Sequence, residues 1–99
     1  MVRLNVQLAQ DKSVVMCQSE NISENGMLLR SDRLLPIGTR VTFECSLPGD
    51  RMPVSGEAEV MRHAVVDVEK VQGMGLRFIF VKSDGQRRVR SFLGRTKPA

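Results

Sequence analysis

The chain has 99 residues, 41% of them hydrophobic, so it can fold as one domain around a single core and is too apolar to be disordered. Fifteen Lys and Arg against eleven Asp and Glu give a net charge of +4, which suits an anionic partner such as a phosphate. No apolar run approaches the roughly 20 residues that span a bilayer, and the alternating start does not resemble a signal peptide, so we expect a cytoplasmic protein.

The cysteines and the single histidine argue against metal and catalytic chemistry. Cys17 and Cys45 stand in apolar runs without a C-x-x-C spacing, which is typical of buried thiols. His63 stands at the expected end of a strand, in a chain with no Tyr, no Trp and no recognisable nucleophile motif. We therefore expect no metal, no cofactor and no enzyme activity.

Alternation of apolar and polar residues predicts β-strands along most of the chain, because successive side chains of a strand point to opposite faces. The fourth predicted strand alternates most regularly. The segment 65–72 is less regular and is expected to be a loop or the weak end of a strand. The second predicted strand starts with residues 14–17 and ends where the motif at Asn21 begins, and the other five cover residues 4–8, 27–30, 40–47, 54–62 and 74–81.

The end of the chain changes to a helical period. Val89, Phe92 and Leu93 recur at i, i+3 and i+4, which is one apolar face of a helix. Ser83 is the expected N-cap, in a capping box with the glutamine three residues later. Gly94 is the expected helix stop.

Six strands joined by short turns do not fit a doubly wound parallel sheet, which needs crossover helices between strands. An antiparallel barrel or sandwich fits better, with the helix covering core that the strands leave open. We expect a single domain over residues 1–99, with its core at about 3–93 and a tail at 94–99.

The stretch Asn21-Ile22-Ser23-Glu24-Asn25-Gly26 has the pattern N-x-S-x-x-G and is the strongest candidate for a binding site. Positions 21 and 23 of an extended segment share a face, so a carboxamide and a hydroxyl can contact one ligand, such as the edge of a purine base. Gly26 can adopt a positive φ or let a ligand approach its backbone. The alternative is an ordinary turn, since these residue types also bond their own backbone.

The chain resembles the PilZ domain, a bacterial receptor module for cyclic di-GMP. Besides the motif, the resemblance rests on the connection 35–41, the strand 73–78 and the helix with Phe92 and Leu93, in the same order and spacing. It covers roughly residues 3–93. It implies a six-stranded antiparallel β-barrel with one C-terminal helix, and cyclic di-GMP as the ligand.

In the family, an R-x-x-x-R segment and the D/N-x-S-x-x-G motif hold the nucleotide. The resemblance therefore implies that Asn21 and Ser23 contact guanine and phosphoribose while Gly26 lets the chain pass close to the ligand. Arg3 stands at the position of the second arginine, and its partner would fall before Met1. One arm of the clamp is missing, so we expect weakened binding or, alternatively, a PilZ-like protein adaptor that binds no nucleotide.

Two further arginines are candidates to compensate. Arg30 closely follows the motif, and Arg62 closes a predicted strand near a position where the family sometimes places a residue that stacks on the ligand. The alternative for each is a solvated side chain at a strand end. In either case we expect a downstream protein partner.

Nucleic acid is a further alternative, because basic residues gather near the C-terminus. The four phenylalanines all occupy apolar positions, which leaves no stacking platform for bases, so we do not expect nucleic-acid recognition. The basic residues that prompt this alternative are Arg87, Arg88, Arg90, Arg95 and Lys97. The first three lie mainly off the apolar face of the helix and are expected to be solvated.

Overall fold

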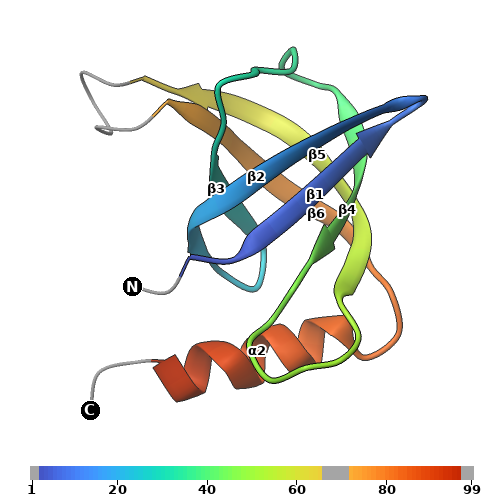
Figure 1. Cartoon of the computed structure of the whole chain (residues 1–99), viewed down its shortest axis with the longest axis vertical. Coiled ribbons are helices and arrows are strands. Elements are labelled where there is room, and N and C mark those ends of the chain that lie inside the picture. Colours follow the sequence, from blue (N-terminus) through green and yellow to red (C-terminus); the bar gives the residue numbers. More distant parts are fainter. Residues whose placement is uncertain (1–2, 66–71, 97–99) are drawn as a thin grey trace.

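A computed structural model describes residues 3–65 and 72–96 and shows a closed antiparallel β-barrel with a helix across one end (Figure 1). The strands bond in the order β1-β2-β3-β6-β5-β4, and β1 pairs with β4 to complete the ring. The predicted fold class is confirmed. Most of the segment 65–72, at residues 66–71, lies outside the described residues. The elements are β1 (Asn5–Gln10), β2 (Ser13–Ile22), β3 (Gly26–Arg30), β4 (Arg40–Cys45), β5 (Val54–Ala64), β6 (Gly73–Val81) and α2 (Gly85–Thr96).

The core fills the inside of the barrel, where one face of each strand points. Strand β4 shows the alternation that its sequence predicts, with Val41, Phe43 and Cys45 buried and the residues between them exposed. Phe43 stacks on Phe78 of β6 with ring centroids 5.0 Å apart. Helix α2 contributes its apolar face, since Val89 and Phe92 belong to the same core, and so closes one end of the barrel.

Both predicted ends of the helix are wrong. Its first intrahelical bond runs from the Arg88 N–H to the Asp84 carbonyl at 3.0 Å, so Asp84 is the N-cap. Ser83 has a φ of 54°, in the left-handed region, and precedes the cap. Gly94 does not stop the helix, which continues to Thr96. An interior glycine costs a helix only about 1 kcal/mol, so it permits an end without requiring one.

Cys45 lies in the core, and its thiol makes the stability of the protein decrease at alkaline pH. Burial raises the pKa of its thiol from 9.0 to about 11. The unfolded chain therefore loses this proton at lower pH than the folded chain does, so the stabilisation is complete below about pH 9 and is lost as the pH rises through about 11. We expect the free energy of unfolding to fall by about 3 kcal/mol from this group across that window.

Urea denaturation at a series of pH values measures the effect, and the absence of tyrosine from the chain simplifies it. The Cys45→Ala variant is the control, because it keeps every other titrating group. A pH dependence equally steep in both proteins would contradict the prediction.

Candidate functional site

A β-bulge in β2 aims the motif outward. The strand is longer than predicted and reaches Ile22, so Asn21 lies inside it rather than beyond its end. Pairing with β3 passes from Ser19–Leu29 directly to Asn21–Leu28, and Glu20 is the extra residue. Strict alternation from the buried Ser19 would point Asn21 into the barrel. The bulge shifts the phase by one residue, so Asn21 is exposed.

Asn21 and Arg62 stand at the two ends of one row of paired residues, which crosses four strands on the outside of the barrel. Asn21 of β2 pairs with Leu28 of β3, Leu28 with Gly75 of β6, and Gly75 with Arg62 of β5. Neighbouring strands lie about 4.8 Å apart, so roughly 14 Å separates the two outermost backbones. Between them Leu28 and Gly75 form a low floor, and a hollow of about 350 Å³, here called the outer groove, lies over this row. Its lining includes four of the predicted site residues: Asn21, Ser23, Gly26 and Arg62.

The two polar groups of the motif differ in what they already bind. The carboxamide of Asn21 makes no hydrogen bond to any residue within 3–65 or 72–96. The Ser23 hydroxyl is engaged in its own turn, where it donates to the Gly26 carbonyl and accepts from the Asn25 N–H, each at 3.3 Å. These bonds are long for a hydroxyl, and Ser23 is exposed, so its hydroxyl can exchange them for a ligand. The roles of both residues in binding stay predictions.

The structure explains why position 26 needs a glycine, and the sequence did not reveal this explanation. Within the described part of the chain, positive φ occurs at Asp11, Gly38, Gly49 and Ser83, and not at Gly26. Gly26 pairs with Arg77 of β6, and a Cβ at position 26 would overlap the carbonyl oxygen of Leu76. The missing side chain therefore allows β3 and β6 to approach closely beneath the groove.

A second glycine shapes the position of Arg62. A Cβ on Gly75 would lie 3.0 Å from Cγ and 3.2 Å from Nε of Arg62, so the arginine side chain lies across the glycine. Arg77 also lines the groove and is paired with Glu59 at 3.0 Å. Sequence reasoning missed Gly75 and Arg77 as groove residues. The available signal was the alternation of β6, which sets both on the solvent face opposite Met74 and Leu76.

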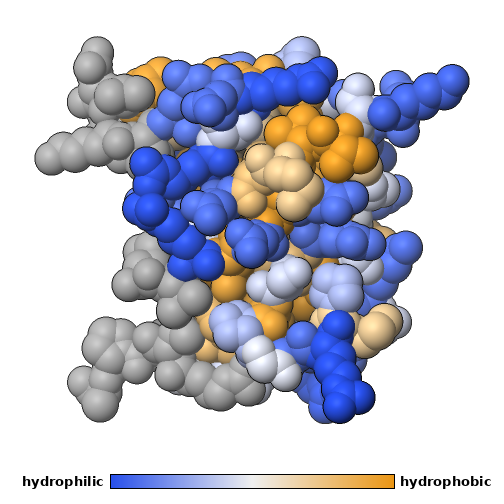
Figure 2. Space-filling model, in the orientation of Figure 1, coloured by the Kyte–Doolittle hydropathy of each residue, from blue (hydrophilic) through white to orange (hydrophobic). Residues whose placement is uncertain are grey.

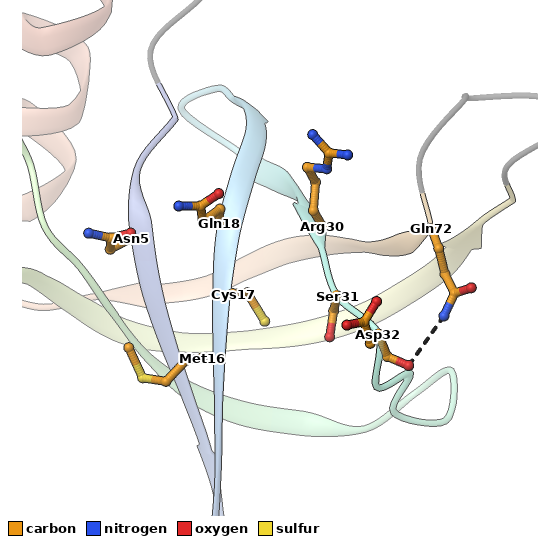
Figure 3. A pocket seen from close by; sticks show the side chains of 8 residues that line it. All are labelled: Asn5, Met16, Cys17, Gln18, Arg30, Ser31, Asp32 and Gln72. Atoms are coloured by element: carbon orange, nitrogen blue, oxygen red, sulfur yellow. Dashed lines mark hydrogen bonds between the residues drawn. The ribbon is translucent and has the colours of Figure 1, made fainter.

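Arg3 and Arg30 are not in the outer groove. Each places its Nε 3.7 Å from Oε2 of Glu20, the bulge residue. Arg30 lines a neighbouring hollow of about 450 Å³, in which Gln72 donates a hydrogen bond to the Asp32 carbonyl at 3.2 Å (Figure 3). Figure 3 shows the Arg30 side chain extending away from Ser31 and Asp32.

The two hollows adjoin on the outside of the barrel. Leu28 of the outer groove and Arg30 of the second hollow are two residues apart on β3, so their side chains leave the same face about 7 Å from each other. Arg3 is held nearby because Leu4 bonds to Ser19 twice. The Ser19 N–H donates to the Leu4 carbonyl at 2.8 Å, and the buried Ser19 hydroxyl accepts from the Leu4 N–H at 2.9 Å.

The helix arginines form ion pairs: Arg87 and Arg90 remain exposed to solvent, as expected, whereas Arg88 is largely covered. Arg87 binds Asp84 at 2.9 Å, and this guanidinium lowers the pKa of the Asp84 carboxyl. Arg88 joins the helix to the β4–β5 loop through Asp50 at 3.3 Å and the Met52 carbonyl. The side chain of Arg95 and all of Lys97 lie outside the described part of the chain.

The motif turn itself is tied to the helix. Arg90 of α2 binds Glu24, inside the N-x-S-x-x-G stretch, at 3.0 Å. The Asn25 carbonyl accepts a hydrogen bond from the Phe78 N–H of β6 at 2.8 Å. The turn beside Asn21 and Ser23 is therefore held from two sides.

His63 has a structural role. Its Nε2 lies 2.7 Å from the Leu35 carbonyl, so the ring donates to the connection between β3 and β4. Among the described residues, no three His, Cys, Asp or Glu side chains gather as metal ligands do. Over the same residues, no helix has the length and apolar character needed to cross a membrane.

Comparisons with known proteins agree with this architecture. The model of the PilZ domain family matches residues 1–95. Among solved structures, the Bacillus subtilis inhibitor of motility (MotI/DgrA) superposes with a TM-score of 0.78 at 21% sequence identity, over 95% of this chain and 46% of that chain. This chain thus spans less than half of that protein, and a likeness at this identity shows the fold alone. No curated protein matches the chain.

Proposed function

The chain belongs to the PilZ domain family, a family of cyclic di-GMP receptors, and from that premise we propose that its outer groove binds cyclic di-GMP. PilZ domains are binding and adaptor modules rather than enzymes, and PilZ proteins are typically cytoplasmic. We propose the same for this chain, with the signal passed to a protein partner.

The row from Asn21 to Arg62 carries this proposal. It sets a carboxamide and a guanidinium on opposite sides of a floor made of Leu28 and Gly75. A carboxamide can donate to and accept from a guanine edge, and a guanidinium can fork onto guanine or phosphate or stack on the base. Leu28 gives the floor an apolar surface for a flat base, and Arg62 lies across Gly75 at its edge.

Asn21 gives the sharpest test, because it makes no hydrogen bond within the described structure that its loss would break. We expect Asn21→Ala to change the free energy of unfolding by less than about 0.5 kcal/mol, as exposed substitutions usually do. Its affinity for cyclic di-GMP should fall by about five- to tenfold, the value of one lost hydrogen bond to a nucleotide. Isothermal titration calorimetry measures the affinity and urea denaturation the stability.

The matched control is Gln10→Ala, which removes an exposed carboxamide from the end of β1, away from the groove. It should bind like the wild type. If Asn21→Ala also binds cyclic di-GMP like the wild type, the nucleotide does not occupy the outer groove.

A protein adaptor that binds no nucleotide is the second candidate. Val14 and Met16 are 54% and 65% exposed on the outer face of β2, which favours a protein contact there. Figure 2 shows apolar surface over this part of the β1–β2 hairpin. The same calorimetry decides, since absence of heat from the wild type at high micromolar cyclic di-GMP would leave the adaptor as the function.

A further inference from the structure

Glu20 holds an unusual position between two arginines. Its Oε2 atom is buried and accepts no hydrogen bond within the described structure. Arg3 and Arg30 each lie 3.7 Å away through Nε, which is an ion pair but too long for a hydrogen bond. An arginine that is well matched to a carboxylate sits at about 2.7 to 2.9 Å and binds with both prongs. Neither arginine does so here.

The contacts of Glu20 are therefore easily exchanged. The side chains of Arg3 and Arg30 are 50% and 40% exposed, so water screens their attraction to the carboxylate. A phosphodiester carries the same single charge but offers two oxygens that can each take a full hydrogen bond. An incoming phosphate can bind this arginine pair better than Glu20 does, provided that the carboxylate moves away.

The arginine pair lies within reach of a ligand in the outer groove. Glu20 directly precedes Asn21, and Arg30 follows Leu28 of the groove floor by two residues on the same face of β3. The phosphate of a ligand whose base contacts Asn21 can therefore reach the Glu20 carboxylate. The carboxylate repels that phosphate and occupies the two guanidinium groups that would bind it.

We infer that Glu20 is a built-in competitor, which occupies the Arg3–Arg30 pair in the ligand-free protein and so lowers the affinity of the domain for a phosphodiester ligand. This inference rests on the proposed function and adds to it a residue that sets the strength of binding. Its consequence is a gain of function. Removing the charge of Glu20 should strengthen binding, whereas removal of a residue that supports the site would weaken it.

The test compares Glu20→Gln with Glu44→Gln by calorimetry with cyclic di-GMP. Both variants raise the net charge by one, but Glu44 is an exposed residue on β4, across the barrel from β3. We expect Glu20→Gln to bind roughly three- to thirtyfold more tightly than the wild type, the worth of two screened ion pairs. Glu44→Gln should stay within about twofold, because salt screens charges beyond about 10 Å.

A double variant shows whether the gain depends on the arginine pair. When Glu20→Gln is added to Arg30→Ala, the gain in affinity over Arg30→Ala alone should be clearly smaller than the gain over the wild type, because only the Arg3 guanidinium is left to release. A gain of the same size without Arg30 would overturn the inference. Urea denaturation of Glu20→Gln serves as the folding control.

The outcomes separate this inference from the proposed function. Heat in the wild type with unchanged affinity in Glu20→Gln overturns the inference alone, and lower stability in that variant would then assign Glu20 a structural role. Heat in neither protein overturns both the inference and the receptor function. Heat that is seen only in Glu20→Gln supports both, and describes a receptor whose own carboxylate prevents binding.

Discussion

Replacing Arg62 by alanine is expected to weaken the binding of cyclic di-GMP by roughly five- to 150-fold, the range for one arginine forked onto a guanine. Arg62 lies across Gly75 at the end of the row that begins at Asn21. The absent side chain of Gly75 leaves space for the stem of Arg62, which lets its guanidinium lie along the groove. Calorimetry on the folded variant measures the loss.

Arg51→Ala is the control for the change in charge. Arg51 is exposed on the β4–β5 loop, beside a separate hollow with Asp50 and Arg88. Both variants lower the net charge by one, so general attraction of the anionic ligand falls equally. Equal loss of affinity in the two variants would mean that Arg62 contributes only charge and not a contact.

Phe43→Ala is expected to lower the free energy of unfolding by about 3 to 5 kcal/mol, a large part of the stability of a domain of this size. Phe43 is 2% exposed and stacks on Phe78 in the middle of the barrel, so alanine leaves a cavity and removes an aromatic pair. Urea denaturation with far-UV circular dichroism measures the change.

Phe80→Ala is the comparison, because its sequence pattern also predicts a buried phenylalanine but the structure exposes it. Period-two alternation sets Phe80 on the core face with Met74, Leu76 and Phe78, but a bulge at Ile79 shifts the register and leaves Phe80 52% exposed. Its loss should cost less than about 1 kcal/mol. Similar costs for Phe43 and Phe80 would contradict the placement of the bulge.

The fold could be predicted because apolar and polar residues alternate along most of its strands. Strand β4 is the clearest case, with no irregularity from Arg40 to Cys45. Strand β2 was predicted to end where the motif begins and instead reaches Ile22, because a bulge at Glu20 hides its alternation. Bulges depend on the partner strand, so a pattern read along one strand does not reveal them.

The site could be predicted only in part, for the same reason. Asn21 and Ser23 are neighbours in sequence, and both line the groove. The roles of Gly75 and Glu20 depend on cross-strand register, which determines that one lies beneath Arg62 and the other between two arginines. Arg3 and Arg30 were assigned to the same site as Asn21, and the structure places them beside it.

The pairing of β1 with β4 has a consequence for any protein that recognises this domain. Every described strand has a neighbour on both sides, which leaves little backbone open to a foreign strand. An exception is β2, which pairs with β1 through residues 13–18 and with β3 through residues 18–22, so one side of residues 13–17 faces no described strand. A partner that adds a strand to the sheet has only such short stretches to use, and the same property opposes amyloid-like stacking of one copy on another. Recognition elsewhere on the barrel must use side chains, and a surface substitution there can abolish it without harm to the fold.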